Sequence, residues 1–214
     1  MGFTKAELES FRGAGVPDIL PDPLRLLLVG INPGLWSAAA GAHFARPGNR
    51  FYPALAAAGI VPEVIDASAG WPAGAAAEFD RIGLGITNFV PRATARADEL
   101  SRAEIRAGAD ALLALVARRH PRVVAILGVT AYRIGFARPH ARVGEQPGTL
   151  GWDDASGSSR LFVVPNPSGL NAHETVASLA LAYGEAARAA GISGTAPTAP
   201  GSRTEAPGCH SRRP

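Results

Sequence analysis

The sequence predicts a single three-layer α/β domain, in which a mainly parallel sheet of about four strands is covered by helices on both faces. Two observations support this class. Short apolar runs, typical of strands buried on both faces, alternate along the chain with segments of helical periodicity. The chain has 214 residues, 47% hydrophobic and 18% charged, which fits one globular domain with a sizeable core.

The first elements expected are a short helix, a buried strand, a tight loop and a second helix. Thr4 and Glu7 have the spacing of a capping box, which predicts the start of the N-terminal helix. The apolar run 26–29 ends in a Gly and Pro turn, as expected of a buried strand. Residues 34–41 are small and predict a tight loop. Residues 49–58 have helical periodicity and precede a glycine.

The middle of the chain is expected to add a strand and a long helix. Residues 61–77 are rich in Ala, Gly and Pro and fit either a loop or a short helix. Residues 81–90 predict the next strand. Ser101 and Glu104 form a second capping-box pattern, which opens a helix expected to run to His120.

The last part of the domain is expected to supply two more strands and the final helix. The run 123–127 is a strand of purely apolar residues, followed by a short helix. Residues 137–159 are rich in Gly, Pro, Asp and Ser and fit an irregular loop or a hairpin. A strand at 161–164 and a helix at 172–190 complete the fold.

Bulk charge is a weak argument for nucleic-acid binding in this chain. The net charge is +3, but residues 193–214 hold three Arg and one Glu, so that +2 of the +3 lies there. We expect these residues to form a disordered tail outside a domain at 1–192. Only a local cluster could bind DNA, and its candidates are Arg46, Arg50, Arg92 and Arg96. The last two could equally form salt bridges.

Cysteine and histidine usage argues against a metal centre. The single cysteine, Cys209, lies in the expected tail, so any chemistry is expected to be metal-free or to use His and carboxylates. His140 and His173 are isolated and give no metal-ligand spacing. No apolar run approaches the roughly 20 residues that a membrane span needs. The first ten residues lack the apolar centre of a secretory signal. We therefore expect a monomer in a bacterial-type cytoplasm.

Two Asn-Pro turns mark the ends of two predicted strands. Asn32 follows the strand at 26–29, and Asn166 follows the strand at 161–164. Ligands of open α/β sheets bind outside the carboxyl ends of strands, so both turns are expected to contribute to one site. A carboxamide is no general base, but it can orient a water. That suffices where a good leaving group departs first and an oxocarbenium-like centre is then captured. Alone, Asn32 could be only a turn residue.

Three motifs, in order, resemble those of the mismatch-specific uracil-DNA and thymine-DNA glycosylases. They are GINPGLWSAAAGAHFARPGNRF from Gly30, GITNFVPRATARADELS from Gly85, and NPSGLN from Asn166. The resemblance runs from about Leu24 to the final helix and leaves out the tail. It implies a uracil-DNA glycosylase-like fold and a monofunctional enzyme without a cofactor. Its substrate would be uracil mispaired with guanine in double-stranded DNA, with thymine and other damaged bases as further candidates.

The same resemblance implies roles for residues of the first motif. Asn32 would hold and polarise the attacking water, and Phe44 would stack on the base once it is turned out of the duplex. Backbone N–H groups at Ile31, Gly34 and Leu35 would bind the negative charge that develops on the base. Phe44 could instead be a core residue. His43 is expected to be a loop residue that is hydrogen-bonded to backbone.

The other two motifs would supply the base edge and the DNA contacts. Asn88 would line the pocket, either touching the base edge or helping catalysis. Leu170 would enter the duplex as an apolar wedge. The further DNA-binding residues would be Ser37, Asn166, Ser168, Gly169 and Asn171. Asn171 could instead cap the last helix. Some relatives carry Arg two positions after the wedge, where this chain has Ala172 followed by His173. Either His173 supplies a weaker contact or the opposite-base preference is relaxed.

Two other functions stay open from the sequence. A non-catalytic module of the same fold could bind DNA lesions or nucleotides, because an amide is a weak catalyst. A small-molecule phosphate binder is the third possibility, although the chain has no P-loop or GxGxxG fingerprint. Schiff-base lyase chemistry is not expected, since Lys5 is the only lysine.

Overall fold

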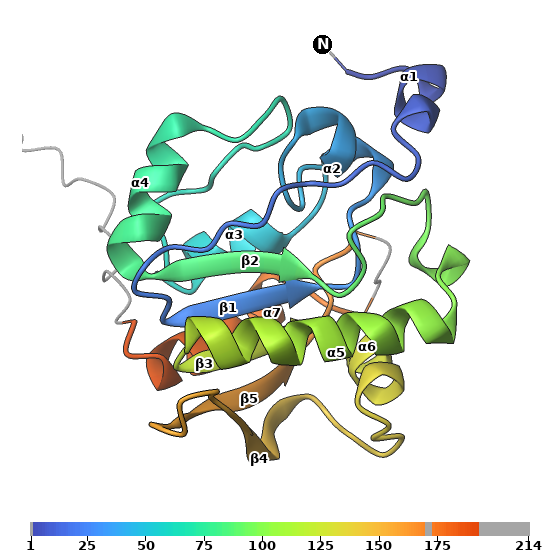
Figure 1. Cartoon of the computed structure of the whole chain (residues 1–214). Coiled ribbons are helices and arrows are strands. Elements are labelled where there is room, and N and C mark those ends of the chain that lie inside the picture. The colour runs from blue at the N-terminus through green and yellow to red at the C-terminus, as the bar shows by residue number, and fades with distance from the viewer. Residues whose placement is uncertain (1, 170–172, 193–214) are drawn as a thin grey trace, which may run out of the picture.

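The apolar runs form a five-stranded sheet in the order β2-β1-β3-β5-β4, with helices on both faces (Figure 1). A computed structural model of the chain describes residues 2–169 and 173–192. The strands are β1 (Leu26–Gly30), β2 (Leu84–Asn88), β3 (Val123–Leu127), β4 (Gly144–Gly151) and β5 (Ser158–Val164). All neighbouring strands are parallel except β4, which pairs antiparallel with β5. The predicted fold class is therefore confirmed.

Several of the helices begin at a capping box. They are α1 (Lys5–Ser10), α2 (Leu35–Ala40), α3 (Phe51–Ala57), α4 (Ala73–Ile82), α5 (Arg102–Arg119), α6 (Val129–Gly135) and α7 (Val176–Ala189), with a 3-10 turn η1 (Ala97–Glu99). Both predicted capping boxes are present, from Thr4 to Glu7 and from Ser101 to Glu104. No helix in the described part of the chain is long and apolar enough to cross a membrane.

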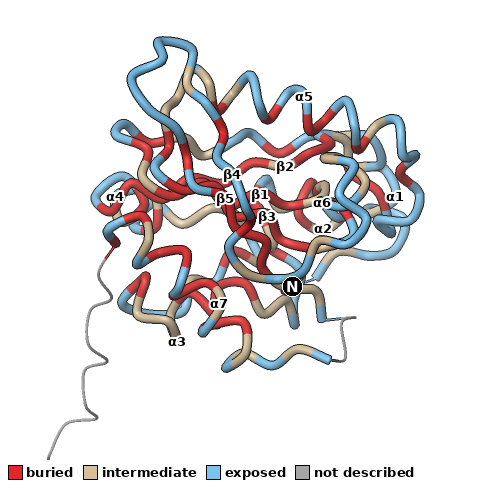
Figure 2. The backbone as a smooth tube through the Cα atoms, turned by 90° about the horizontal axis from the view of Figure 1, so that it is seen from below, coloured by how far each residue is buried: buried red, intermediate tan, exposed pale blue. Residues whose placement is uncertain are grey.

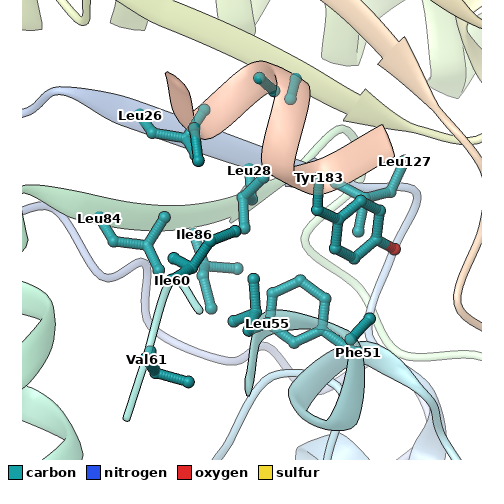
Figure 3. Close-up of a cluster of buried hydrophobic side chains, with 14 of the residues drawn as sticks. Leu26, Leu28, Phe51, Leu55, Ile60, Val61, Leu84, Ile86, Leu127 and Tyr183 are labelled. Carbon is teal, nitrogen blue, oxygen red and sulfur yellow. The ribbon is translucent and has the colours of Figure 1, made fainter. Parts of the chain in front are cut away.

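One face of the sheet packs on α3, α4 and α7. Successive strand residues point to opposite faces, so alternate residues share one core. Figure 3 shows this cluster, in which Leu28 and Ile86 from the sheet meet Phe51 and Leu55 of α3 and Tyr183 of α7. These side chains are buried, which anchors α3 and the loop before it to the end of β1.

The other face of the sheet packs on α5 and α6. Leu27 and Val29 of β1 point here and join Ile105, Leu112 and Val116 of α5. Figure 2 shows the resulting burial pattern, with the strands buried and the helices exposed along their outer sides. Two cores on either side of one sheet explain why the central strands are almost continuously apolar.

Two of the expected local structures in the first half were wrong. Residues 34–41 contain the helix α2 rather than only a loop, because Gly34 is an extended N-cap and the following Ala residues favour helix. The strand predicted at 81–90 begins only at Leu84, because α4 extends to Ile82. Gly83 ends that helix in the left-handed conformation, at φ 71°.

In the second half, the hairpin alternative is confirmed and the start of the final helix differs from the expectation. The segment 137–159 contains β4, so the sheet has a fifth strand, as the hairpin alternative allowed. Its Gly and Pro content fits an irregular edge strand, where Pro costs no ladder hydrogen bond. The final helix α7 begins at Val176 rather than near 172, and Thr175 is its N-cap. Asn171 and the tail 193–214 lie outside the described residues.

The strand order locates the ligand-binding edge. β1 lies between β2 and β3, so the chain moves outward from β1 to β2 and then crosses to the other side of β1. Ligand crevices of open α/β sheets form at such a switch point, at the carboxyl ends of the strands. Both Asn-Pro turns lie at this edge, because they follow the parallel strands β1 and β5.

Candidate active site

A cavity of about 570 Å³ lies at the carboxyl edge of the sheet. Its walls come from the segment after β1, the end of β2, the end of β3 and the turn after β5. The predicted site residues that line it are Ile31, Asn32, Gly34, Ser37, Phe44, Asn88, Asn166 and Ser168. Leu35 and Gly169 are not among its lining residues, and Leu170 and Asn171 lie outside the described part of the chain. The fold thus brings residues from all three motifs to one cavity.

The amide nitrogen of Asn32 is held by three acceptors. Its Nδ2 donates to the carbonyl oxygens of Pro33 at 3.0 Å and Arg92 at 3.1 Å, and to the hydroxyl oxygen of Thr94 at 2.8 Å. The Thr94 hydroxyl donates in turn to the carbonyl of Arg96 at 2.7 Å, so toward Asn32 it acts as an acceptor. Because all three partners are acceptors, they must face the amide nitrogen of Asn32, and the orientation of its carboxamide is therefore fixed.

The carboxamide oxygen of Asn32 is therefore the end that can act on a ligand. Among the described residues, none donates a hydrogen bond to its Oδ1. Since Asn32 lines the cavity, Oδ1 is available to accept a hydrogen bond from a water. Thr94, which is 1% exposed, was missed as a site residue, although it lies inside the second motif. Its local pattern carries no signal of this contact.

The ring of Phe44 forms a stacked pair at one wall of the cavity. Phe44 has a left-handed backbone, at φ 54°, and its ring centroid lies 4.0 Å from that of Phe51 with a 21° interplanar angle. One ring face is thus covered by α3, and the half-buried Phe44 also lines the cavity. Phe44 thus packs against the core and also lines the cavity, and its stacking on a base stays a prediction.

Gly30 leaves room for the side chains of Asn88 and Phe44. A Cβ atom at this position would lie 2.3 Å from Asn88 Oδ1 and 3.2 Å from Phe44 Cζ. The last residue of β1 therefore has to be glycine for Asn88 and Phe44 to keep these positions. Asn88 is the register partner of Gly30 on β2, which is why its side chain reaches the same wall.

His43 supports Asn88 from inside the protein. Its ring is 2% exposed and contacts the Pro17 carbonyl through Nε2 at 2.9 Å and Asn88 Nδ2 through Nδ1 at 3.1 Å. Burial lowers the pKa of His43 below its usual range, so the ring favours the neutral form. The expected backbone contact is present, and the contact with Asn88 was missed. The Tyr52 hydroxyl donates to the His43 carbonyl at 2.8 Å.

Arg50 joins the loop between α2 and α3 to the Asn-Pro turn after β5. Its backbone N–H donates to the Pro167 carbonyl at 3.1 Å, and its guanidinium donates to the carbonyls of Ser168 and Glu174. The Asn166 side chain accepts from the Ser168 N–H at 2.9 Å, which closes the turn. A Cβ on Gly169 would lie 2.9 Å from a backbone carbonyl of the first loop. The two loops are thus packed against each other.

The arginine candidates divide into paired and unpaired side chains. Arg92 forms an ion pair with Glu104 at 2.6 Å, which lowers the pKa of Glu104 to about 2. Arg96 pairs with Asp98, the only carboxylate among the cavity-lining residues of the described chain. Arg46 is exposed at the cavity and has no ion pair within 2–169 and 173–192. The salt-bridge alternative therefore holds for the first two.

Ser37 is more buried than its expected phosphate contact would suggest. It is 4% exposed, and its hydroxyl oxygen accepts from the backbone N–H of Ala45 at 3.3 Å. This bond ties α2 to the loop that carries His43 and Phe44. A phosphate contact by Ser37 stays a prediction, as do those of the second loop.

A separate cluster of possible metal ligands lies at the other edge of the sheet. His120, Asp153 and Asp154 bring one ligand atom each within 4.8 Å of one another. Protein contacts account for this arrangement, because His120 bonds Asp153 at 3.0 Å and stacks on Trp152 at a centroid distance of 4.8 Å. The bond to Asp153 raises the pKa of His120. The cluster therefore connects the end of α5 to the β4–β5 hairpin, far from the cavity.

The arrangement suits a hydrolytic reaction that needs little proton abstraction. The cavity offers a fixed carboxamide oxygen, an aromatic wall and a second carboxamide at the end of β2. Asp98 is the sole carboxylate among the described residues that line the cavity, and it is exposed and paired with Arg96. No strong general base among these residues therefore faces Asn32.

The sequence matches a model of a known protein family. A family model described as the uracil DNA glycosylase superfamily matches residues 17–186. The match spans most of the chain and includes every strand, both Asn-Pro loops and all residues that line the cavity.

Proposed function

The chain belongs to the uracil DNA glycosylase superfamily, and we propose that it is a monofunctional DNA N-glycosylase that excises uracil mispaired with guanine in double-stranded DNA. The observation that carries this proposal is the fixed carboxamide of Asn32, whose nitrogen has three protein acceptors and whose oxygen has no donor among the described residues. An oxygen held in this way can orient a water. Capture of an oxocarbenium-like sugar carbon by water requires such orientation.

The proposed reaction breaks the bond between C1′ of the deoxyribose and N1 of uracil. The bonding electron pair leaves with the base, whose oxygens spread the negative charge, and C1′ becomes oxocarbenium-like. A water that donates a hydrogen bond to Asn32 Oδ1 then attacks C1′ and passes its second proton to solvent. The products are a free base and an abasic site. Lys5 is the only lysine and lies on α1, so no Schiff-base step follows.

The base would be held by the aromatic wall and by Asn88. The Phe44 ring is covered on one face by Phe51, and the other face would stack on the everted uracil. Asn88 would meet the edge of the base above Gly30. Turning a base out of the duplex costs least for a mismatch, which favours G:U over A:U pairs. Thymine would need more room at the same wall.

The DNA duplex would lie across the two packed loops. Ser168 and Gly169, with Leu170 and Asn171 outside the described residues, would contact the strand and fill the gap left by the base. Arg46 at the cavity mouth is a further candidate for a phosphate contact, because its guanidinium has no ion pair within the described chain. Binding should therefore weaken as the salt concentration rises.

A duplex with one G:U pair tests the proposal. We expect the wild-type protein to release uracil and leave a site that breaks in hot alkali. Asn32→Ala should slow release by about 100-fold or more, the size expected for loss of a group that positions a reacting water. Leu181→Ser, at a position that is 72% exposed on α7, is the matched control and should keep full activity.

The outcome also separates the proposal from its main alternative. Full activity of Asn32→Ala would refute the assigned role of this carboxamide. Tight binding of the wild-type protein to an abasic-site duplex, without release of uracil from G:U, would instead favour a non-catalytic lesion-binding module.

A further inference from the structure

His43 and Asn88 form a hydrogen-bonded pair whose polarity is set by a third group. The ring Nε2 lies 2.9 Å from the Pro17 carbonyl oxygen, which can only accept. Nε2 must therefore carry a hydrogen. In the neutral ring this leaves Nδ1 without a hydrogen, so Nδ1 is an acceptor. Its partner at 3.1 Å has to be a donor, which is the amide nitrogen of Asn88.

The neutral ring of His43 thereby determines which end of Asn88 faces the cavity. With Nδ2 turned to the ring, Oδ1 lies over Gly30, where a Cβ atom would be only 2.3 Å away. The reversed carboxamide would set Oδ1 against the lone pair of Nδ1, and two acceptors repel each other. Asn88 lines the cavity. The groups that it can offer to a ligand are therefore the acceptor oxygen Oδ1 and, beside it, the N–H of Nδ2 that is not bonded to His43.

We infer that His43 is a positioning residue that fixes the polarity of Asn88, and so makes the cavity prefer bases with an N–H donor over bases with a ring-nitrogen acceptor. The inference rests on the proposed function, because it assumes that the everted base reaches Asn88. Uracil presents N3–H beside O4, which matches an oxygen acceptor beside an N–H donor. Cytosine presents the opposite pattern, with an N3 acceptor beside an amino donor, and is disfavoured.

Protonation of His43 reverses this preference. A charged ring carries hydrogens on both nitrogens, so Nδ1 becomes a donor and the carboxamide turns its oxygen toward the ring. The cavity then faces the base with the amide nitrogen. Asp18, before β1, is the charged group that favours the protonated ring, whereas burial opposes it. From α3, the Tyr52 hydroxyl contacts the His43 backbone carbonyl and not the ring, and Asn88 on β2 is uncharged.

The test compares the release of 5-fluorouracil and 5-fluorocytosine placed opposite guanine, since fluorine makes both bases better leaving groups. Single-turnover rates at about pH 7 and about pH 5.5 give a uracil-to-cytosine rate ratio for each protein. For His43→Leu we expect a ratio about 10-fold or more below that of the wild type at the higher pH, because Asn88 is then free to rotate. His140→Leu, on the exposed loop before β4, is the matched control and should keep the wild-type ratio.

The pH dependence separates positioning from simple damage to the fold. The wild-type ratio should fall at the lower pH by more than the ratio of His43→Leu does, since the chemistry of the bases themselves is the same in both proteins. In Asn88→Ala, the additional fall of the rate ratio that the wild type shows at the lower pH should be absent. Should His43→Leu fail to fold, Asn88→Ala and the wild type still give the comparison.

A spectroscopic measurement tests the ring directly. In the wild-type protein labelled with ¹⁵N at histidine, the resonances of His43 should show a protonated Nε2 and an unprotonated Nδ1 at neutral pH. The reverse tautomer would overturn the inference, as would a rate ratio unchanged by His43→Leu and by pH while uracil release persists. A wild-type protein that releases neither base would overturn the proposed function as well.

Discussion

Replacing Thr94 by Val tests whether the carboxamide of Asn32 is positioned by its neighbours. Val has nearly the shape of Thr but lacks the hydroxyl that accepts from Asn32 Nδ2 at 2.8 Å and donates to the Arg96 carbonyl at 2.7 Å. The side chain is buried, so water cannot easily replace either bond. The variant should fold, with its defect centred on Asn32.

The size of the effect follows from the number of acceptors. A carboxamide nitrogen has two hydrogens, and three acceptors surround it in this protein. Thr94→Val leaves the two carbonyl oxygens of Pro33 and Arg92, so the orientation of Asn32 weakens but is not lost. One hydrogen bond is worth about 1 kcal/mol net. We therefore expect uracil release to slow by about 5-fold, well short of the loss expected for Asn32→Ala, and the free energy of unfolding to fall by about 1–2 kcal/mol.

Single-turnover release of uracil from a G:U duplex at saturating protein measures the chemical step without substrate affinity. Thr94→Ser restores the hydroxyl and should recover most of the rate. Thr149→Val, at an exposed position of β4, removes a hydroxyl far from the cavity and should have no effect. The reasoning is refuted if Thr94→Val retains the wild-type rate, or if Thr94→Ser is as slow as Thr94→Val.

Three further predictions concern the base-binding wall. Gly30→Ala should slow release from G:U by about 10-fold or more, since its Cβ would displace Asn88, and overpacking of this kind typically costs 1–3 kcal/mol; an unchanged rate would contradict the close approach. Phe44→Leu should weaken binding of a non-cleavable 2′-fluoroarabino-uracil duplex by about 10-fold, the loss expected for one aromatic stack, while binding of an undamaged duplex stays the same. Because burial lowers the pKa of His43, the unfolded chain binds more protons than the folded one just below about pH 6.5. The free energy of unfolding should therefore decrease as the pH is lowered through this range. His43→Gln should show a shallower decrease in denaturant titrations, and equal slopes for the two proteins would exclude this contribution.

Local patterns in the sequence determined the ends of several elements and the position of the site. The capping boxes at Thr4 and Ser101 were readable because both partners lie within one helical turn. The purely apolar run at Val123–Leu127 could only be a strand buried on both faces. The Asn-Pro turns after β1 and β5 placed the site at the carboxyl edge, since parallel strands end at the same edge of a sheet.

Local patterns failed where two structures had similar propensities. The segment 34–41 is rich in small residues, which suit a tight loop and a short helix equally, and the packing of Leu35 and Ala38 against Ala93 accompanies the helix. β4 contains Gly and Pro residues that weaken any strand signal, and its pairing with β5 decides its conformation.

The sequence by itself determined which residue types meet at the cavity, because the three motifs and the strand ends at which they lie can be read along the chain. Only the tertiary structure decided how the two carboxamides are oriented. Asn32 is held by Thr94, 62 residues away, and Asn88 is held by His43, 45 residues away. A carboxamide has a donor end and an acceptor end of nearly equal size. The groups that distant parts of the chain place beside it therefore determine which end faces a ligand.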